Sequence, residues 1–154
     1  MAAQFNKADV DYLVNDKKFV SALPSIVESQ SEFVMQAHIK EVRDILNKKR
    51  LVYKEREKVA GHLETHSVNF LVPANRRAGL AIAVLPGHNS HLIAEAWGFK
   101  CDDIRGVNSN LKIGLVYDVS GETWGVESRH ILEKKADLAV ASDSLPTFEE
   151  RLPS

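Results

Sequence analysis

The sequence contains a single cysteine, no long apolar run and almost no net charge, and each of these absences excludes a class of protein. With Cys101 alone, an intramolecular disulfide is excluded, and we expect a cytoplasmic protein. No stretch approaches the roughly 18 consecutive apolar residues of a membrane helix. The opening MAAQFNKADVDYLV has charged residues where a signal peptide has its apolar core. The net charge of −1 gives no overall preference for nucleic acid or for a membrane surface.

Several catalytic motifs are missing as well. The chain has no GxSxG elbow for a nucleophilic serine and no GxGxxG or GxxxxGK loop for dinucleotides or phosphates. Cys101 stands beside Asp102 and Asp103, which would raise its pKa and reduce its reactivity as a nucleophile. We therefore expect no cofactor, and we favour a protein without catalytic activity over an enzyme.

A length of 154 residues with 44% hydrophobic composition fits one domain with a substantial core. Residues 1–60 are typical of an N-terminal helical arm, with one helix over 7–23, ending before Pro24, and a longer one over 25–58. Gly61 is the expected end of that helix, because glycine tolerates the left-handed conformation there. The helix has a broad apolar stripe, which favours packing on its own core, while pairing with a second copy stays open. The stripe comprises Met35, Ile39, Val42, Leu46 and Tyr53, flanked by Val34, Ile45 and Val52.

Residues 61–154 are typical of an α/β domain that forms one compact unit with the arm. Strands are expected over 66–72, 80–85, 111–118 and 137–141, helices over 91–99 and 126–136, and a loosely packed tail over 144–154. In the first strand, Val68, Phe70 and Val72 share one face by their period of two. Helices between strands imply crossover connections and a mixed sheet, in the order α-α-β-β-α-β-α-β. The predicted fold class is α/β, with α+β as the alternative.

Basic residues concentrate between Lys40 and Lys58, where eight bases accompany four acids. One interpretation is a solvated helix face. The other is a surface for an anionic partner, since contact with phosphates needs little more than such a face. The candidate contacts for nucleic acid or a partner protein are Lys48, Lys49, Arg50 and Lys54 in this segment and Arg76 and Arg77 in the polar loop after residue 72.

The stretch GHLETH, residues 61–66, places two histidines four apart with a glutamate between them. On a helix, Glu64 would point away from a metal held by His62 and His66, which excludes a zinc-protease site. On a strand, the three side chains would share a face that leads directly into the apolar core. We interpret the stretch as a connection after a helix, with a strand beginning near His66.

Two further sets of residues are candidate sites. In PGHNSH, an anion could bind at a helix start, where backbone N–H groups point outward, although a simple helix cap explains the same residues. This set is His88, Asn89, Ser90 and His91. A metal-dependent nuclease needs an acid on one strand and an acid-x-lysine pair on the next, and LAIAVL has no acid. Solvated loop acids, and no metal site, are therefore the favoured interpretation of the weak metal candidates Asp102, Asp103, Asp118 and Glu122.

Residues 66–143 combine an F-x-V strand followed by a basic pair, the helix end AWGFKCDD and a strand ending in Tyr117 and Asp118. In these features the chain resembles a domain family of unknown function found in bacterial and prophage-encoded proteins. The resemblance implies a small α/β domain in a bacterial or phage context and carries over no catalytic residue. We predict a non-catalytic binding or regulatory protein that contacts a partner protein or a nucleic-acid complex, with phage–host defence as one setting. The alternatives are a metal-dependent phosphoester hydrolase and an oligomeric scaffold that dimerises through the long helix.

Overall fold

The computed structural model describes residues 17–75, 78–121 and 123–152, with side chains from Glu32 onwards. By its contacts, the chain divides into two compact units between Val34 and Met35. The elements in chain order are α2 (Lys17–Lys48), β1 (Lys54–Ala60), β2 (Thr65–Val72), β3 (Leu80–Leu85), α3 (Ser90–Arg105), β4 (Lys112–Tyr117), α4 (Val126–Lys135), β5 (Leu138–Ala141), the short 3-10 helix η1 (Ser142–Ser144) and α5 (Leu145–Arg151).

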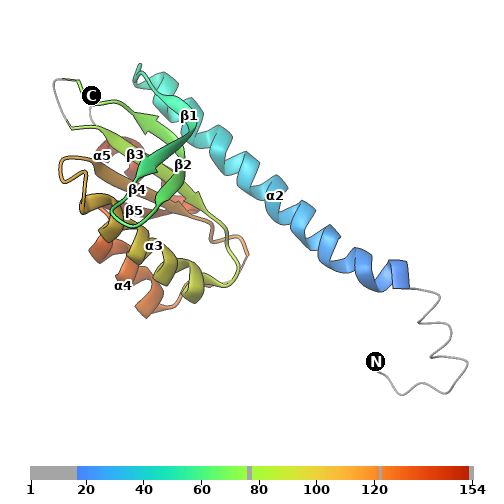
Figure 1. Ribbon diagram of the computed structural model, residues 1–154. Helices are drawn as coiled ribbons and strands as arrows, with labels where there is room; N and C mark the ends of the chain where they lie inside the picture. Colours follow the sequence, from blue (N-terminus) through green and yellow to red (C-terminus); the bar gives the residue numbers. More distant parts are fainter. Residues whose placement is uncertain (1–16, 76–77, 122, 153–154) are drawn as a thin grey trace, which may run out of the picture. The chain divides into compact units, whose positions relative to one another are not determined.

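The five strands form one mixed sheet in the order β1-β2-β3-β4-β5 (Figure 1). β1, β2 and β3 are antiparallel neighbours, whereas β3, β4 and β5 run parallel. Parallel neighbours need a crossover, and α3 and α4 supply the two crossovers. β3 is paired on both sides and all its residues are buried, as its uninterrupted apolar sequence predicts. The predicted α/β class with a mixed sheet is confirmed.

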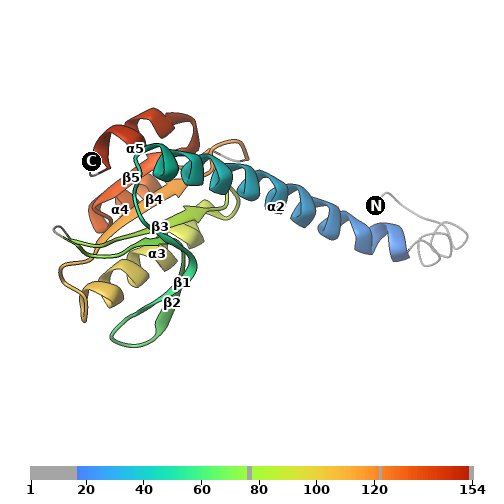
Figure 2. The same cartoon turned by 90° about the horizontal axis from the view of Figure 1, so that it is seen from above.

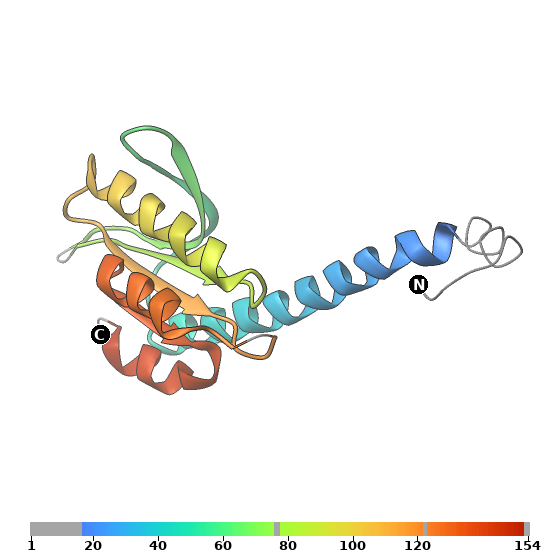
Figure 3. The ribbon, with the colours of Figure 1, turned by 90° about the horizontal axis from the view of Figure 1, so that it is seen from below.

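Helices cover both faces of the sheet, so this part of the chain has three layers (Figures 2 and 3). One face packs against α3 and α4 through a cluster that includes Trp97 and Leu132. The other face packs against α5 and the part of α2 that follows Met35, and its core includes Val42 and Phe148. Both of these side chains are completely buried. From Met35 onwards, the apolar stripe of the long helix therefore packs within its own unit, as predicted.

The long helix ends at Lys48, and the prediction that it continues to Gly61 is wrong. Arg50 has a left-handed backbone with φ 57°, and the amides of Arg50 and Leu51 bond back to carbonyls in the last helical turn. These two bonds form a Schellman motif, which normally has glycine at the left-handed position. Arginine, unlike glycine, is not typical of a helix end, so the sequence does not predict that the helix stops at Lys48.

Residues 54–60 form the strand β1 where a helix was predicted. In KEREKVA, the bases Lys54, Arg56 and Lys58 recur at every second position, a period that fits a strand better than a helix. Gly61 lies in the turn between β1 and β2, which pair as an antiparallel hairpin. The sheet thus has one more strand than the sequence predicts.

The predicted helix boundary before Pro24 is also wrong, because α2 runs through this residue. Residues 7–16 of the predicted first helix lie outside the described part of the chain. Proline removes one helical hydrogen bond and disfavours helix at the residue before it, but a long helix can continue past that position.

The side chains of β2 change face within the strand. Val68 packs on the α3 side of the sheet, whereas Phe70 and Val72 pack on the α2 side, contrary to the predicted period of two. The change occurs at Asn69, whose Oδ1 accepts a hydrogen bond from the amide of Val84 at 2.7 Å. This side-chain bond stands where a strand-to-strand backbone bond would otherwise lie, and the pairing of β2 with β3 begins only at Phe70. The first half of β2 therefore pairs only with β1 and not with β3.

The C-terminal residues form a packed helix, not the loosely packed tail that was predicted. Phe148 is completely buried, and Leu145 and Leu152 are buried beside it in the core on the α2 side. Their spacing of three and then four residues is helical. Pro146 stands in the first turn of α5, where a missing N–H leaves no helical bond unmade.

Candidate functional site

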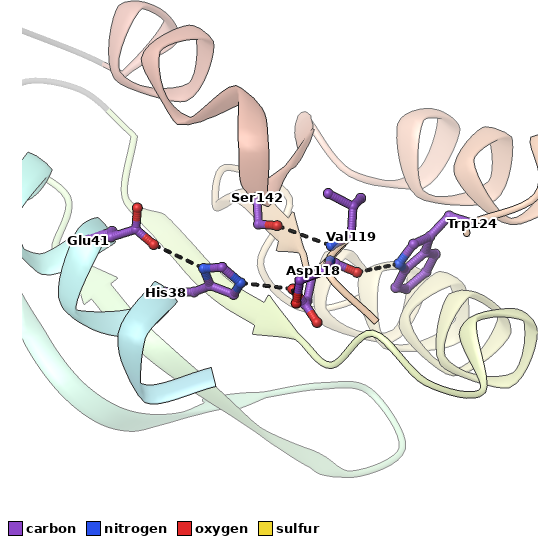
Figure 4. Close-up of polar contacts among 7 residues, drawn as sticks. His38, Glu41, Asp118, Val119, Trp124 and Ser142 are labelled. Atoms are coloured by element: carbon purple, nitrogen blue, oxygen red, sulfur yellow. Dashed lines mark hydrogen bonds and ion pairs between the residues drawn. The ribbon is translucent and has the colours of Figure 1, made fainter. Parts of the chain in front are cut away.

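The carboxyl ends of the parallel strands β3, β4 and β5 lie together at one end of the sheet. Open α/β sheets bind their ligands at this end. Asp118 follows β4 at this end and is only 5% exposed. Its carboxylate accepts bonds from the amide and the hydroxyl of Ser120 at 3.0 and 2.7 Å and from His38 at 2.8 Å (Figure 4). Its carbonyl accepts a bond from the indole N–H of Trp124 at 2.7 Å. Asp118 thus connects α2 with the loop that follows β4.

Two neighbouring loops complete this end of the sheet. The hydroxyl of Ser142, after β5, accepts a bond from the amide of Val119 at 3.1 Å (Figure 4). Gly87, after β3, lies directly against Asp118: a Cβ at this position would meet the carboxylate and would stand 2.8 Å from the carbonyl oxygen. The Asp118 carboxylate is therefore surrounded by the protein's own groups.

His38 bridges two carboxylates. Its Nδ1 lies 3.0 Å from Oε1 of Glu41, and its Nε2 lies 2.8 Å from Oδ1 of Asp118. Burial would lower the pKa of His38, but the two hydrogen bonds raise this pKa above its ordinary value. Burial would raise the pKa of Asp118, but the bonds from Ser120 and His38 lower it. A protonated ring that donates to two carboxylates has no nitrogen left to accept a proton from a substrate, so this pair ties α2 to β4 and does not act as a general base.

A second buried pair joins the β1–β2 hairpin to α3. The Nε2 atom of His66 lies 2.7 Å from Oδ2 of Asp103, and the two side chains are 1% and 2% exposed. Asp103 also accepts bonds from the amides of Leu63 and Glu64 at 2.7 and 3.2 Å. Burial would raise the pKa of Asp103, but these bonds, led by that of His66, lower it. This pair, like the first, holds two elements together.

The acids considered as metal ligands are separated in the structure. Asp103 and Asp118 are each bonded to a histidine, as described above. Asp102 pairs with Lys135 at 2.8 Å, and Glu122 lies outside the described residues. Among the residues that the structure describes, no three side chains of His, Cys, Asp or Glu gather as a metal site. Of the two strands considered for a nuclease, β3 has the sequence LAIAVL, which contains no acid. The other, β4, is followed by Asp118, and the residue two positions later is Ser120 and not a lysine.

The first four residues of GHLETH, 61–64, form the turn of the hairpin, and Thr65 and His66 begin β2. His62 and Glu64 are exposed, whereas His66 is buried against Asp103. The interpretation as a connection is confirmed, but the stretch connects two strands and not a helix to a strand.

The loop PGHNSH leads into α3, which begins at Ser90. Asn89 has φ 52°, a left-handed conformation that asparagine tolerates, and its side chain makes no capping bond. His91 is exposed and lies 3.5 Å from Glu95. Binding of an anion by His88, Asn89, Ser90 and His91 stays a prediction.

The bases around the end of α2 fall into two groups. Those on α2 and directly after it are engaged: Lys48 pairs with Glu149 at 2.9 Å, and Lys49 donates to the carbonyl of Leu152 at 3.3 Å. Two further pairs, at 3.0 and 2.8 Å, are Lys40 with Asp44 and Arg43 with Glu55. In the described part of the chain no ion pair involves the second group, whose exposed members are Arg50, Lys54, Arg56 and Lys58. Arg76 and Arg77 lie outside the described residues.

Two members of this second group have an unusual backbone. Arg50 and Arg56 have φ 57° and 56°, and residues other than glycine in this left-handed region cost about 1–3 kcal/mol each. Such strain persists only where the surroundings enforce it, and it is concentrated at functional sites. Arg56 and Lys58 belong to the segment identified as basic, but they were not named as contacts. The basic residues at i, i+2 and i+4 are the signal that could have identified them.

No family model, no curated protein and no solved structure matches this chain. Among the described residues, no helix is both long enough and apolar enough to cross a membrane. The assignment of a function therefore rests on the geometry of the described residues.

Proposed function

We propose that this protein is a non-catalytic binding protein that contacts nucleic acid through a basic strip, defined as Arg50, Lys54, Arg56 and Lys58. One observation carries the proposal. All four side chains are exposed and form no ion pair within the described residues, whereas Lys40, Arg43 and Lys48 on α2 are paired with acids. Positive charge without a partner in the protein attracts the phosphate backbone of nucleic acid, and contact releases the counterions of the phosphates.

The geometry of β1 suits such a contact. β1 is an edge strand, and Lys54, Arg56 and Lys58 are exposed while the glutamates between them are half-buried. The three bases therefore lie along one edge of the sheet, with their side chains accessible to a partner. An exposed row of positive charge at a sheet edge is accessible to a phosphate backbone.

Two glutamates, Glu55 and Glu57, lie between the strip residues on β1, and α2 engages the first of them. Glu55 accepts two bonds from the guanidinium of Arg43, at 2.9 and 2.8 Å. This hydrogen bonding lowers the pKa of Glu55, so the carboxylate stays charged and is engaged by α2. Glu55 consequently competes little with phosphates for the bases beside it.

The other functions considered have less support. The buried histidines are bonded to carboxylates, and the acids do not gather, so a metal-dependent phosphoester hydrolase lacks an assembled site among the described residues. The long helix buries its stripe against the sheet from Met35 onwards, which removes that part of it from a dimer interface. The bacterial or phage setting stays a prediction.

A binding measurement with matched variants tests the proposal. We expect a fluorescein-labelled 20-base-pair DNA duplex of arbitrary sequence to bind the full chain in an anisotropy titration. Replacing Lys54, Arg56 and Lys58 by glutamine should weaken binding by at least about tenfold. The control replaces Lys112, Lys134 and Lys135 by glutamine, which removes the same charge from other surfaces and should change affinity by less than about threefold. Equal affinity of the wild type and the strip variant would rule out the strip as the contact.

A further inference from the structure

β1 forms one edge of the sheet, and β5 forms the other. In the described residues no strand lies beyond β5. Backbone groups alternate in direction along a strand. The amide of Asp137 bonds to a carbonyl of β4, so the amides of Ala139 and Ala141 point towards β4 as well. Leu138 and Val140 therefore direct their backbone N–H and C=O groups outward, to the open edge.

A cavity of about 600 Å³ lies over this edge. Residues 139–141 of β5 line it, and its charged lining residues are Arg129 from α4, Arg151 from α5 and Asp143 from η1. The two helices lie on opposite faces of the sheet, so the cavity straddles the strand (Figure 3). A second cavity, of about 410 Å³, is lined by residues 137–138 and again by Arg151. We call the two together the β5 trough, because they follow the strand from its beginning to its end.

The chemistry of the β5 trough is that of a strand-binding groove. β5 has the sequence LAVA, which contains neither a charge nor the proline with which many edge strands prevent pairing. Arg129 and Arg151 are exposed on the two sides of the edge. Arg129 forms no ion pair within the described residues, and Arg151 donates only a long bond of 3.4 Å to the carbonyl of Asp137. Two guanidinium groups and one carboxylate, that of Asp143, therefore lie beside the outward backbone groups of Leu138 and Val140, for which the described residues supply no strand partner.

We propose that the β5 trough binds an extended acidic segment of a partner protein, which adds to the sheet as a strand beside β5. Its backbone pairs with Leu138 and Val140, as in other cases of strand addition, and its carboxylates reach Arg129 and Arg151, whose planar forks suit bidentate bonds. The basic strip on β1 and the β5 trough lie at opposite edges of the sheet. The two contacts are independent, and either can fail without the other.

Two synthetic peptides and the full chain test this proposal. The probe is a fluorescein-labelled heptapeptide of alternating valine and glutamate, and its comparison alternates valine and lysine. We expect the glutamate peptide to bind and the lysine peptide not to bind. The double variant Arg129→Gln, Arg151→Gln should bind the glutamate peptide at least about tenfold more weakly. Lys134→Gln, which removes a charge from α4 outside the β5 trough, should bind as the wild type does.

Amide hydrogen exchange measured by NMR separates strand addition from simple charge attraction. On binding of the glutamate peptide, the amides of Leu138 and Val140 should become protected, while those of Ala139 and Ala141 should change little, because they already bond to β4. Equal binding of both peptides, binding without protection at Leu138 and Val140, or no binding of either would overturn the proposal. A double variant that binds the glutamate peptide as tightly as the wild type does would also overturn the proposal. Self-association of the double variant, with no binding of either peptide by the wild type, would overturn it as well. The arginines would then only prevent pairing of β5 with a second copy.

Discussion

The Nε2 atom of His66 lies 2.7 Å from Oδ2 of Asp103, and this buried contact sets the position of the β1–β2 hairpin. Because β2 is paired with β3 only from Phe70 onwards, the outer half of the hairpin has no support from the sheet. α3 supplies that support: the Asp103 carboxylate also bonds to two amides of the hairpin turn, and its carbonyl accepts a bond from the amide of His62. The orientation of the basic strip on β1 therefore depends on this pair.

Replacing Asp103 by asparagine should loosen the hairpin. The pKa of Asp103 is lowered in the folded protein, so its contribution to stability is present above the unfolded pKa and is lost as pH falls through the lowered value. The variant should lack this contribution at neutral pH. We expect the amides of residues 61–66 to exchange faster at pH 7, measured by hydrogen-exchange mass spectrometry, with β4 unchanged. Asp102→Asn is the control. Equal exchange rates in the two variants would contradict the role of Asp103 in holding the hairpin against α3.

Gly61→Ala should destabilise the same junction by a different route. A Cβ at this position would meet the Asp103 carboxylate and would stand 2.6 Å from the carbonyl oxygen of Glu64. Overpacking of this kind costs about 1–3 kcal/mol, which denaturant unfolding would detect. The control is Gly125→Ala, where no atom lies within 4 Å of the added Cβ. If the two variants unfold at the same denaturant concentration, the close packing of Gly61 is not as described.

The stability of the protein should depend on pH through His38. The pKa of His38 is raised in the folded state, so its stabilising effect is complete below the unfolded value of about 6.5 and is lost as pH rises through the raised value. His38→Gln should remove about 1.5–3 kcal/mol at pH 6, the range for hydrogen bonds to charged groups, and less above the raised pKa. Thermal unfolding from pH 5 to 9 measures this, with the exposed His130→Gln as control. A constant difference from the wild type across this range would contradict a raised pKa of His38.

Asn69→Ala should leave the amide of Val84 without its acceptor at the point where the sheet opens. A buried donor that loses its partner costs about 1–3 kcal/mol, so the unfolding midpoint should fall accordingly. Asn69→Asp keeps an oxygen at the same position and should recover much of that loss. Equal destabilisation by both substitutions would show that the oxygen does not serve this role.

The sequence predicts well those elements whose pattern is complete within a short window. LAIAVL reads as a doubly buried strand, and the alternation of strands and helices after it implies the parallel half of the sheet. Prediction from the sequence fails where a residue occupies a position at which a different residue type is usual. Arg50 ends α2 in a position normally held by glycine, and the charges of KEREKVA conceal a strand. The helix α5 was missed although Leu145, Phe148 and Leu152 have helical spacing.

The candidate site depends on contacts between distant residues, which explains why only part of it could be predicted. The segment from Lys40 to Lys58 was identified as basic, and two of the four strip residues, Arg50 and Lys54, were named. Lys48 is neutralised by Glu149, about a hundred residues later in the chain, and no local pattern announces that pair. The bonds of His38 to Asp118 and of His66 to Asp103 are equally remote in sequence.

The most direct test of the central claim is the dependence of nucleic-acid affinity on salt. For a duplex, the logarithm of the association constant falls with the logarithm of salt concentration with a slope of about −0.9 for each phosphate contacted. Anisotropy titrations of the wild type between about 50 and 200 mM salt should show such a slope, and the variant Lys54→Gln, Arg56→Gln, Lys58→Gln should lower its magnitude by about three. A wild type that does not bind the duplex at the lowest salt, or a slope that is the same in both proteins, would contradict the basic strip as a nucleic-acid contact.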